Sequence, residues 1–158
     1  MPIIIEKAQE KDFDQVYAIL MHEEVNRFMN YPVLEKSAFR EIWLDIFTRL
    51  NLWKEGEEIL GLAVITKGTY RIKHIAYIDK LAIKQSFRSK GLGTVFFNQI
   101  IASLAQVGLI KIELGVETDN QRAINFYKKL GFEIEGLRKK LLNRDGQFID
   151  NYFMAKML

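Results

Sequence analysis

The stretch Arg88-Ser-Lys-Gly-Leu-Gly-Thr94 decides how the rest of the chain is interpreted. It follows an apolar, strand-like run from Ile78 to Ile83 and opens an amphipathic, helix-like segment near Gly91. Because glycines lack Cβ, a large ligand can approach the backbone closely, and the N–H groups of a helix's first turn then point at it. The positive end of the helix dipole favours an anion at the same place. The turn therefore predicts a phosphate-binding cradle, although short glycine spacings also occur in plain connections.

The composition is that of an ordinary soluble globular protein. The 158 residues are 49% hydrophobic and 27% charged, and this length predicts a single domain over residues 1–158. The sequence has no cysteine, which excludes a disulfide framework, a cysteine-based zinc site and a thiol nucleophile. No window approaches a membrane span, and the apolar run at the N-terminus is too short for a signal peptide. We therefore expect a cytoplasmic protein with no membrane partner.

The charge distribution argues against a nucleic-acid partner. A net charge of +3 is small, whereas nucleic-acid-binding proteins concentrate Lys and Arg on one face or in tracts. From Lys80 to Ile112 there is no acidic residue, while Arg88 and Lys90 lie within the glycine turn. The turn is thus suited to a polyanion, and chance in an apolar region is the other interpretation.

Hydrophobic periodicity predicts a mixed α/β fold, with a mixed sheet flanked by helices. Glycine, proline and Asp-Gly positions mark the boundaries between its elements. The predicted elements, in chain order, are a strand at 3–6, a helix from Glu10, an irregular connection at 22–32, a helix capped by Ser37 with an apolar face reaching Leu50, antiparallel strands at 58–66 and 72–83, a helix from the glycine turn towards Gly108, a strand at 111–117, a short helix capped by Thr118 or Asp119 and ending at Gly131, and a hairpin around Arg144-Asp-Gly-Gln147.

Two separated motifs resemble those of the GNAT family of acyl-CoA-dependent N-acetyltransferases. The first is Arg88-x-x-Gly91-x-Gly93 after an apolar strand, and the second is Asn120-x-x-Ala123-x-x-x-Tyr127-x-x-x-Gly131-Phe132 after the next helix and strand. The resemblance covers about Tyr77 to Gly136. It implies a mostly antiparallel sheet of about six to seven strands with about four helices and splayed central strands. It also implies an enzyme that uses acetyl-CoA as co-substrate.

The C-terminal tail resembles one bacterial branch of this family more closely. Its segments 131–136 and Arg138-Lys, with 145–150 through Met154-Ala155, are similar to the ending of enzymes that act on free amino acids and other small amines. Enzymes that acetylate ribosomal-protein N-termini commonly carry glutamate where Gly115 stands here. The resemblance therefore implies a small-molecule primary amine, such as an amino acid or polyamine, as acceptor. The alternatives are a protein or peptide N-terminus, or a non-catalytic acyl-CoA sensor.

The resemblance also implies the coenzyme-binding residues. The backbone of the strand end would pair with pantetheine, the glycine turn would bind the pyrophosphate, and Arg88 would add charge-assisted contacts. Asn120 would contact the coenzyme arm, although it could equally cap a helix. The implied set is Leu81, Ala82, Ile83, Arg88, Ser89, Lys90, Gly91, Leu92, Gly93, Thr94, Asn120, Ala123 and Phe126.

Tyr127 matches the family's usual general acid, which protonates the departing thiolate. An amphipathic tyrosine with a buried ring and a solvated hydroxyl is the alternative. Amine attack also requires removal of a proton from the ammonium at neutral pH. Asp79, Glu113 and Glu117 are candidate bases, each of which could instead be a solvated strand residue, and a relay of ordered water is the simplest option. The backbone amide near Ile83 could hold the thioester oxyanion.

The sequence gives little information about the acceptor pocket or the oligomeric state. We expect the segment from Phe28 to Tyr31, the acidic His22-Glu-Glu24 and the final hairpin to lie near the acceptor. His22 and His74 are isolated histidines with no cysteine, so we predict no metal site. Exposed sheet edges make a homodimer plausible.

Overall fold

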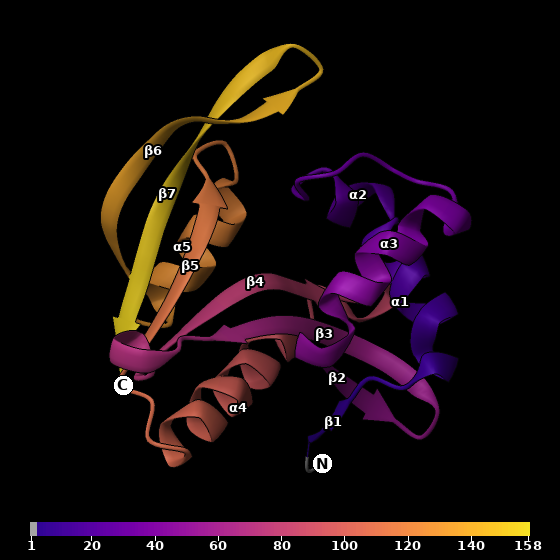
Figure 1. Cartoon of the computed structure of the whole chain (residues 1–158), viewed down its shortest axis with the longest axis horizontal. Helices are drawn as coiled ribbons and strands as arrows, with labels where there is room; N and C mark the ends of the chain where they lie inside the picture. The colour runs from indigo at the N-terminus through magenta and orange to yellow at the C-terminus, as the bar shows by residue number, and fades with distance from the viewer. Residues whose placement is uncertain (1–2) are drawn as a thin grey trace. The chain divides into compact units, whose positions relative to one another are not determined.

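The computed structural model describes residues 3–158, which form two compact units (Figure 1). The first unit comprises residues 3–65 and 80–99, and the second comprises residues 66–79 and 100–158. No helix within residues 3–158 combines the length and the apolar character needed to cross a bilayer.

The first unit contains β1 (Ile4–Lys7), α1 (Phe13–Leu20), α2 (Glu23–Asn26), α3 (Lys36–Ile46), β2 (Leu50–Glu55) and most of β3 (Glu58–Lys67). The second contains β5 (Lys111–Glu117), α5 (Gln121–Lys129), β6 (Glu133–Arg144) and β7 (Gln147–Met157), while β4 (Ile75–Ile83) and α4 (Leu92–Gln106) contribute to both.

The strands follow the order β1-β2-β3-β4-β5-β7-β6. The pairs β1–β2, β2–β3, β5–β7 and β6–β7 are antiparallel. β4 and β5 run parallel and pair over residues 75–78 and 111–114, and both strands continue beyond these pairs. The described residues thus form a seven-stranded, mostly antiparallel sheet with five α-helices. This confirms the predicted fold class.

The core of the first unit is built on the facing sides of α1 and α3. Phe39 and Trp43 of α3 are fully buried, and the ring centroid of Phe13 lies 5.7 Å from the first and 5.5 Å from the second. Leu50 and Leu52 of β2 are also fully buried in the same cluster. Each large apolar side chain removed from water in this way contributes about 1.5–3 kcal/mol to folding, so this layer anchors the N-terminal segments to the sheet.

A charged pair lies inside the first unit. Lys54 Nζ on β2 is 2.8 Å from Asp12 Oδ1, and the two side chains are only 7% and 3% exposed. The other carboxylate oxygen of Asp12 accepts a hydrogen bond of 2.7 Å from the backbone N–H of Gln9, at the start of the 3-10 turn that leads into α1. Because a charge without water needs a partner, Asp12 is stabilised by Lys54, and Lys54 is stabilised by Asp12 and, at the longer distance of 3.8 Å, by Glu6 Oε2.

The predictions for the first unit are correct for β1, α1, α3 and β3, and wrong at three places. The N-cap of α3 is Glu35, and Ser37 is already the second helical residue. The connection at 22–32 contains the short helix α2. Leu50, which fits the helical spacing of the preceding apolar face, instead pairs with Val64 of β3 as the first residue of the unpredicted strand β2.

The C-terminal hairpin of the second unit has the predicted turn. Asp145 and Gly146 both adopt left-handed backbone conformations, with φ of 51° and 87°, as the tight turn between antiparallel strands requires. In Figure 1 the two strands form a long twisted ribbon at the yellow end of the chain. The antiparallel register of β7 with β5 joins this ribbon to the sheet, so residues of three neighbouring strands face one side of the second unit.

Candidate active site

The predicted phosphate cradle lies in the first unit, between the end of β4 and the start of α4. Ser89 and Gly91 have left-handed backbone conformations, with φ of 63° and 72°, and a Cβ at Gly91 would meet no atom within 4 Å. The amides of residues 92–94 form the first turn of α4, where a helix has no internal acceptor for them. Lys90 Nζ lies 5.7 Å from the centroid of the Phe87 ring. Open space, N–H donors and a lysine thus meet at one place, which suits an anion.

Arg88 holds the turn to the end of β4. Its Nε donates a hydrogen bond of 3.1 Å to the carbonyl oxygen of Ile83, and its Nη1 lies 3.2 Å from Glu24 Oε2. Leu81 and Ile83 are half-buried and Ala82 is buried. The carbonyl of Ile83, expected to pair with pantetheine, therefore already accepts one hydrogen bond in this structure. Glu24, expected near a cationic acceptor, is already paired with a guanidinium.

The second group of predicted residues lies at the start of α5 in the second unit. Asn120 is the N-cap, and its Oδ1 accepts a hydrogen bond of 3.1 Å from the backbone N–H of Ala123. This corrects the prediction that Thr118 or Asp119 caps the helix, since the Asp119 carboxylate instead pairs with Arg144 at 2.9 Å. The capping interpretation of Asn120 is confirmed. Its contact with the coenzyme stays a prediction, for which the side-chain NH₂ group is the suitable donor.

Tyr127 lies in an aromatic cluster on α5. Its ring centroid is 5.4 Å from that of Phe126 and 5.7 Å from that of Phe132. Burial raises the pKa of the Tyr127 hydroxyl, and the nearby Glu117 carboxyl and Tyr77 hydroxyl raise this pKa further. The phenol is therefore protonated at neutral pH, as a proton donor must be.

Glu117 is the buried member of the three predicted candidate bases. Asp79 accepts a hydrogen bond of 2.5 Å from a threonine hydroxyl, and Glu113 Oε1 lies 2.9 Å from Lys111 Nζ. Glu117 is only 9% exposed. Burial raises the pKa of its carboxyl above the ordinary value, an effect that its own backbone and the Arg144 charge partly oppose. A carboxylate with a raised pKa is a stronger proton acceptor than an exposed one.

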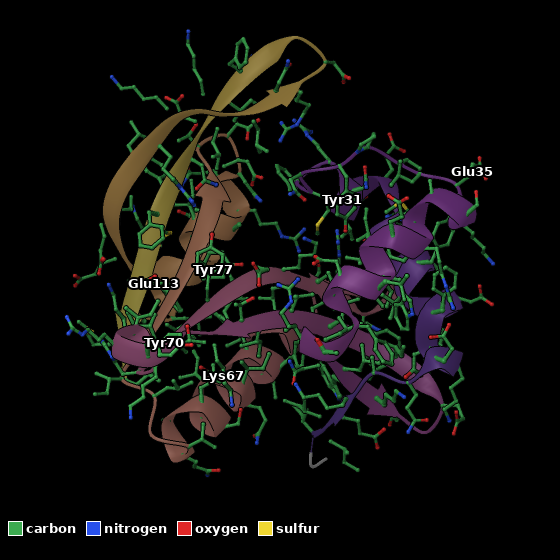
Figure 2. The ribbon with its side chains drawn as sticks, in the orientation of Figure 1. Tyr31, Glu35, Lys67, Tyr70, Tyr77 and Glu113 are labelled. Carbon is green, nitrogen blue, oxygen red and sulfur yellow. The ribbon has the colours of Figure 1, made fainter. Side chains whose placement is uncertain are left out.

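A polar cluster surrounds Gly115, and its residues were not among the site residues predicted from the sequence. Arg138 Nη2 on β6 lies 2.7 Å from Asn151 Oδ1 and 3.4 Å from the Tyr77 hydroxyl. Tyr77, labelled in Figure 2, lies on β4 opposite Glu113 of β5. The available signals were a glycine inside an alternating strand and an arginine in the tail, and neither reveals that the sheet register brings them together.

Tyr31, expected to contact the acceptor, lies in the first unit (Figure 2). Its hydroxyl is buried and makes no hydrogen bond to any of residues 3–158. Burial raises the pKa of this hydroxyl, and Lys80 Nζ lies 5.3 Å from the ring centroid. Because a buried hydroxyl without a partner costs free energy, a ligand that supplies one would be favoured here.

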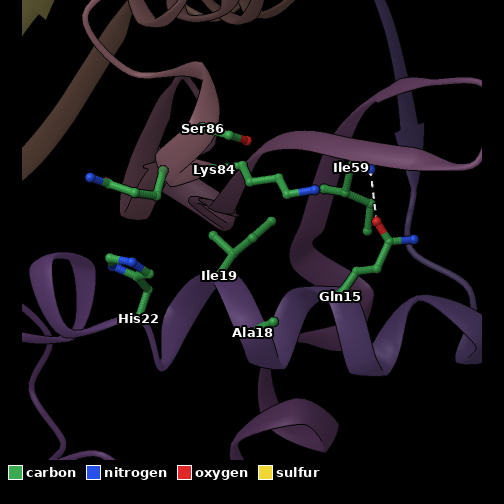
Figure 3. Close-up of a pocket in the computed structure, with 8 residues that line it drawn as sticks. Gln15, Ala18, Ile19, His22, Ile59, Lys84 and Ser86 are labelled. Atoms are coloured by element: carbon green, nitrogen blue, oxygen red, sulfur yellow. Dashed lines mark hydrogen bonds between the residues drawn. The ribbon is translucent and has the colours of Figure 1, made fainter.

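A separate pocket of about 440 Å³ opens beside α1 in the first unit (Figure 3). Apolar and polar side chains both line it, and none of the predicted coenzyme-binding residues is among them. The pocket therefore does not coincide with the predicted donor site. Its lining includes Ala18, Ile19, His22, Ile59, Lys84 and Ser86.

Comparison with known proteins establishes the family. Residues 13–132 match the model of the acetyltransferase (GNAT) family. The chain belongs to the GNAT family. This GNAT acetyltransferase is 27% identical to the L-amino acid N-acetyltransferase AaaT of Escherichia coli K12 over 159 residues, which cover 98% of each chain.

Solved structures agree on the fold of this GNAT acetyltransferase. The crystal structure of the ribosomal-protein-alanine N-acetyltransferase from Brucella melitensis has a TM-score of 0.78 at 21% identity and covers 98% of this chain and 99% of its own. That of yncA from Salmonella typhimurium, solved with its cofactor acetyl-CoA, has a TM-score of 0.76 at 17% identity and covers 100% and 95%. The family match confirms the resemblance seen in the sequence, and with it the use of acetyl-CoA as acetyl donor for N-acetyl transfer.

Proposed function

We propose that this GNAT acetyltransferase transfers the acetyl group of acetyl-CoA directly to a primary amine of a small molecule, with amino acids as the preferred class of acceptor. The observation that carries the proposal is a pair of buried protonatable groups in the second unit, in which the Glu117 carboxyl helps to raise the pKa of the Tyr127 hydroxyl. One is held protonated and can donate, and the other is a buried carboxyl that can accept. Similarity to an L-amino acid N-acetyltransferase along nearly the whole chain supports the class of acceptor.

In the proposed reaction the neutral amine nitrogen attacks the carbonyl carbon of the thioester, and a C–N bond forms. As the C–S bond breaks, Tyr127 gives its proton to the sulfur, so that coenzyme A leaves as a thiol. The nitrogen gives up one proton to Glu117, directly or through one water molecule. Exchange with solvent then restores both residues. The sequence contains no cysteine, which agrees with transfer inside a ternary complex and without a sulfur-bound acyl intermediate.

The donor is held, in this proposal, by the turn from Arg88 to Thr94 and by the backbone of Leu81–Ile83. The N–H groups at the start of α4 bind the pyrophosphate, and Arg88 fixes the turn through its bond to the Ile83 carbonyl. Because these contacts are made by backbone, they select the coenzyme without selecting the acceptor. The identity of the acceptor must therefore depend on side chains elsewhere.

A protein or peptide N-terminus is the second candidate acceptor, since one structural neighbour acetylates a ribosomal protein. A site for a polypeptide must leave room for a chain to continue beyond the reacting residue. Around Gly115 the second unit is instead occupied by the side chains of Arg138, Asn151 and Tyr77, all within 3.0 Å of where a Cβ would lie. This crowding favours a compact acceptor.

The proposal is tested by measuring release of coenzyme A thiol from acetyl-CoA over a panel of amines. The panel contains free amino acids, polyamines, and peptides that represent protein N-termini. We expect stimulation by free amino acids above all others. Peptide-only stimulation would move the function to the second candidate, and coenzyme binding without release for any amine would identify a non-catalytic sensor.

Glu117 gives a prediction for the pH dependence of activity. A base must be deprotonated, so kcat/KM should fall as the pH drops through the pKa of Glu117, which lies above the ordinary value of 4.5. Glu117→Gln should remove this acidic limb and lower kcat by about 100-fold. The measurement is the pH–rate profile of both proteins, with Glu113→Gln as control because that carboxylate is paired with Lys111. An unchanged acidic limb in Glu117→Gln would exclude Glu117 as the base.

The Glu117 carboxyl should also affect how the free energy of unfolding depends on pH. Because the pKa of Glu117 is raised in the folded state, its contribution to stability is fully present below the unfolded-state pKa and is lost as the pH rises through the folded-state pKa. Glu117→Gln should therefore gain stability relative to the wild type at neutral pH but not at pH about 4. Denaturant titrations at the two pH values measure this difference.

A further inference from the structure

Arg138 has an unusual environment for an exposed strand residue. Its guanidinium leans over β7 and β5, with Nη2 at 2.7 Å from Asn151 Oδ1 and 3.4 Å from the Tyr77 hydroxyl. Its Cζ lies 5.3 Å from the centroid of the Phe153 ring, and that ring is itself stacked with Tyr77 at 6.3 Å. Two hydrogen bonds and an aromatic face thus fix the direction of the guanidinium.

The space that the guanidinium fills exists because residue 115 is glycine. A Cβ at Gly115 would lie 2.6 Å from Arg138 Nη2, 2.8 Å from Asn151 Oδ1 and 3.0 Å from the Tyr77 hydroxyl. Carbon does not approach polar atoms so closely, so any side chain at 115 would displace this cluster. Gly115 and Arg138, which are 23 residues apart in the sequence, therefore form one structural feature.

The charge of Arg138 has no carboxylate partner within the described part of the chain. Among residues 3–158 its hydrogen-bond partners are an amide oxygen and a phenol, both neutral. Two other cations of the second unit are paired with carboxylates, since Arg144 lies 2.9 Å from Asp119 and Lys111 lies 2.9 Å from Glu135. A guanidinium has five N–H donors, and the two hydrogen bonds engage only Nη2. The N–H groups of Nε and Nη1 are left to donate charge-assisted hydrogen bonds to a carboxylate.

The strand register connects Arg138 to the proposed reaction. Arg138 of β6 pairs with Asn151 of β7, and Asn151 pairs with Glu117 of β5, so the three residues form one row across the sheet. Tyr77 contacts Arg138 and also raises the pKa of Tyr127. Arg138 thus belongs to the same side of the second unit as the proposed acid and base.

We propose that Arg138 binds the carboxylate of the acetyl acceptor and so makes the enzyme selective for α-amino acids over amines that lack a carboxylate. This inference rests on the proposed function. The guanidinium lies over Gly115, which is two residues from Glu117 along β5, or roughly 7 Å at the rise of a strand. An α-amino acid carries its carboxylate and amine on one carbon, so it can satisfy both ends with hydrogen bonds of ordinary length.

The experiment compares matched acceptors in the wild type and in Arg138→Gln. Each of the twenty L-amino acids is measured beside its carboxamide, which keeps the amine and the side chain but removes the negative charge. Because hydrogen bonds to charged groups contribute about 1.5–3 kcal/mol, we expect Arg138→Gln to lower kcat/KM for the acids by about 10- to 150-fold. For the carboxamides, kcat/KM of Arg138→Gln should stay within about twofold of the wild-type value.

Controls separate this inference from the proposed function. Lys139→Gln removes the neighbouring charge on β6. It should leave unchanged the ratio of kcat/KM for the amino acids to kcat/KM for their carboxamides. Gly115→Ala should reproduce the loss for acids, because its Cβ displaces the guanidinium. Equal loss for acids and amides in Arg138→Gln, or weaker coenzyme A binding by that variant, would overturn the carboxylate role. If the wild type acetylates no amine at all, the proposed function itself fails.

Discussion

Replacing Tyr127 by phenylalanine should lower kcat by about 10²- to 10⁴-fold, the usual contribution of a positioned proton donor. The substitution removes only the hydroxyl, so the ring contacts with Phe126 and Phe132 are retained. Burial keeps the phenol protonated by raising its pKa. A thiolate released where water is scarce is also more basic than in bulk solvent, since burial disfavours its charge. The hydroxyl can therefore stabilise and protonate the leaving sulfur.

The measurement is single-turnover acetyl transfer together with coenzyme A affinity. Affinity should be unchanged, because the hydroxyl acts on the sulfur only as the C–S bond breaks. Tyr152→Phe is a matched control, since it makes the same chemical change on β7 of the same unit. If Tyr127→Phe turned over at the rate of the wild type while chemistry is rate-limiting, Tyr127 would not be the acid.

Asp12→Ala should lower the free energy of unfolding by about 3–5 kcal/mol, the cost of leaving a buried charge without its partner. Lys54, with a side chain only 7% exposed, would lose the carboxylate at 2.8 Å and keep only the longer, 3.8 Å pair with Glu6 Oε2. The substitution also removes the acceptor for the N–H of Gln9. Urea denaturation followed by circular dichroism measures the change.

Two further variants show whether burial is the cause of this loss. Asp14→Ala breaks a pair with Lys36 of the same length, 2.8 Å, but with exposed side chains, and should have little measurable effect. The double variant Asp12→Ala with Lys54→Met removes both charges and should recover much of the lost stability. A double variant no more stable than Asp12→Ala would show that the capping bond, rather than the ion pair, carries the effect.

The fold was predictable where local pattern and tertiary packing agree. The glycine turn, α4, β5 and the Asp-Gly hairpin all carry strong local signals, and each was found at its place. β2 was missed because Leu50 continues the apolar spacing of α3, and local spacing alone cannot reveal the strand. Pairing with β1 and β3 decides it, as in the register of Leu52 with Glu6 and Leu62. Such pairing is non-local and leaves little trace in the sequence nearby.

The candidate site was predictable where a motif carries it. The residues of the glycine turn and of α5 could be named because two motifs resemble those of a known family, and their roles in binding and catalysis stay predictions. Alternation along β5 places Glu117 on the same face as Gly115, but its burial depends on β7, whose Asn151 pairs with it. Arg138 could not be assigned a role, because its contact with Tyr77 spans 61 residues and depends on register across four strands.

The outermost position of β6 bears on how copies of this protein behave at high concentration. An edge strand offers its backbone to any other strand and is a common starting point for aggregation. The pairing of β6 with β7 shifts register twice, once between Ile134 and Gly136 and once between Arg138 and Leu142, and Lys140 within the second shift has a φ of 52°. An edge broken in this way, with Lys139 and Lys140 exposed beside the break, is a poor template for a further strand. The irregularity near Arg138 therefore also protects the sheet from growing, and a dimer through this edge is disfavoured.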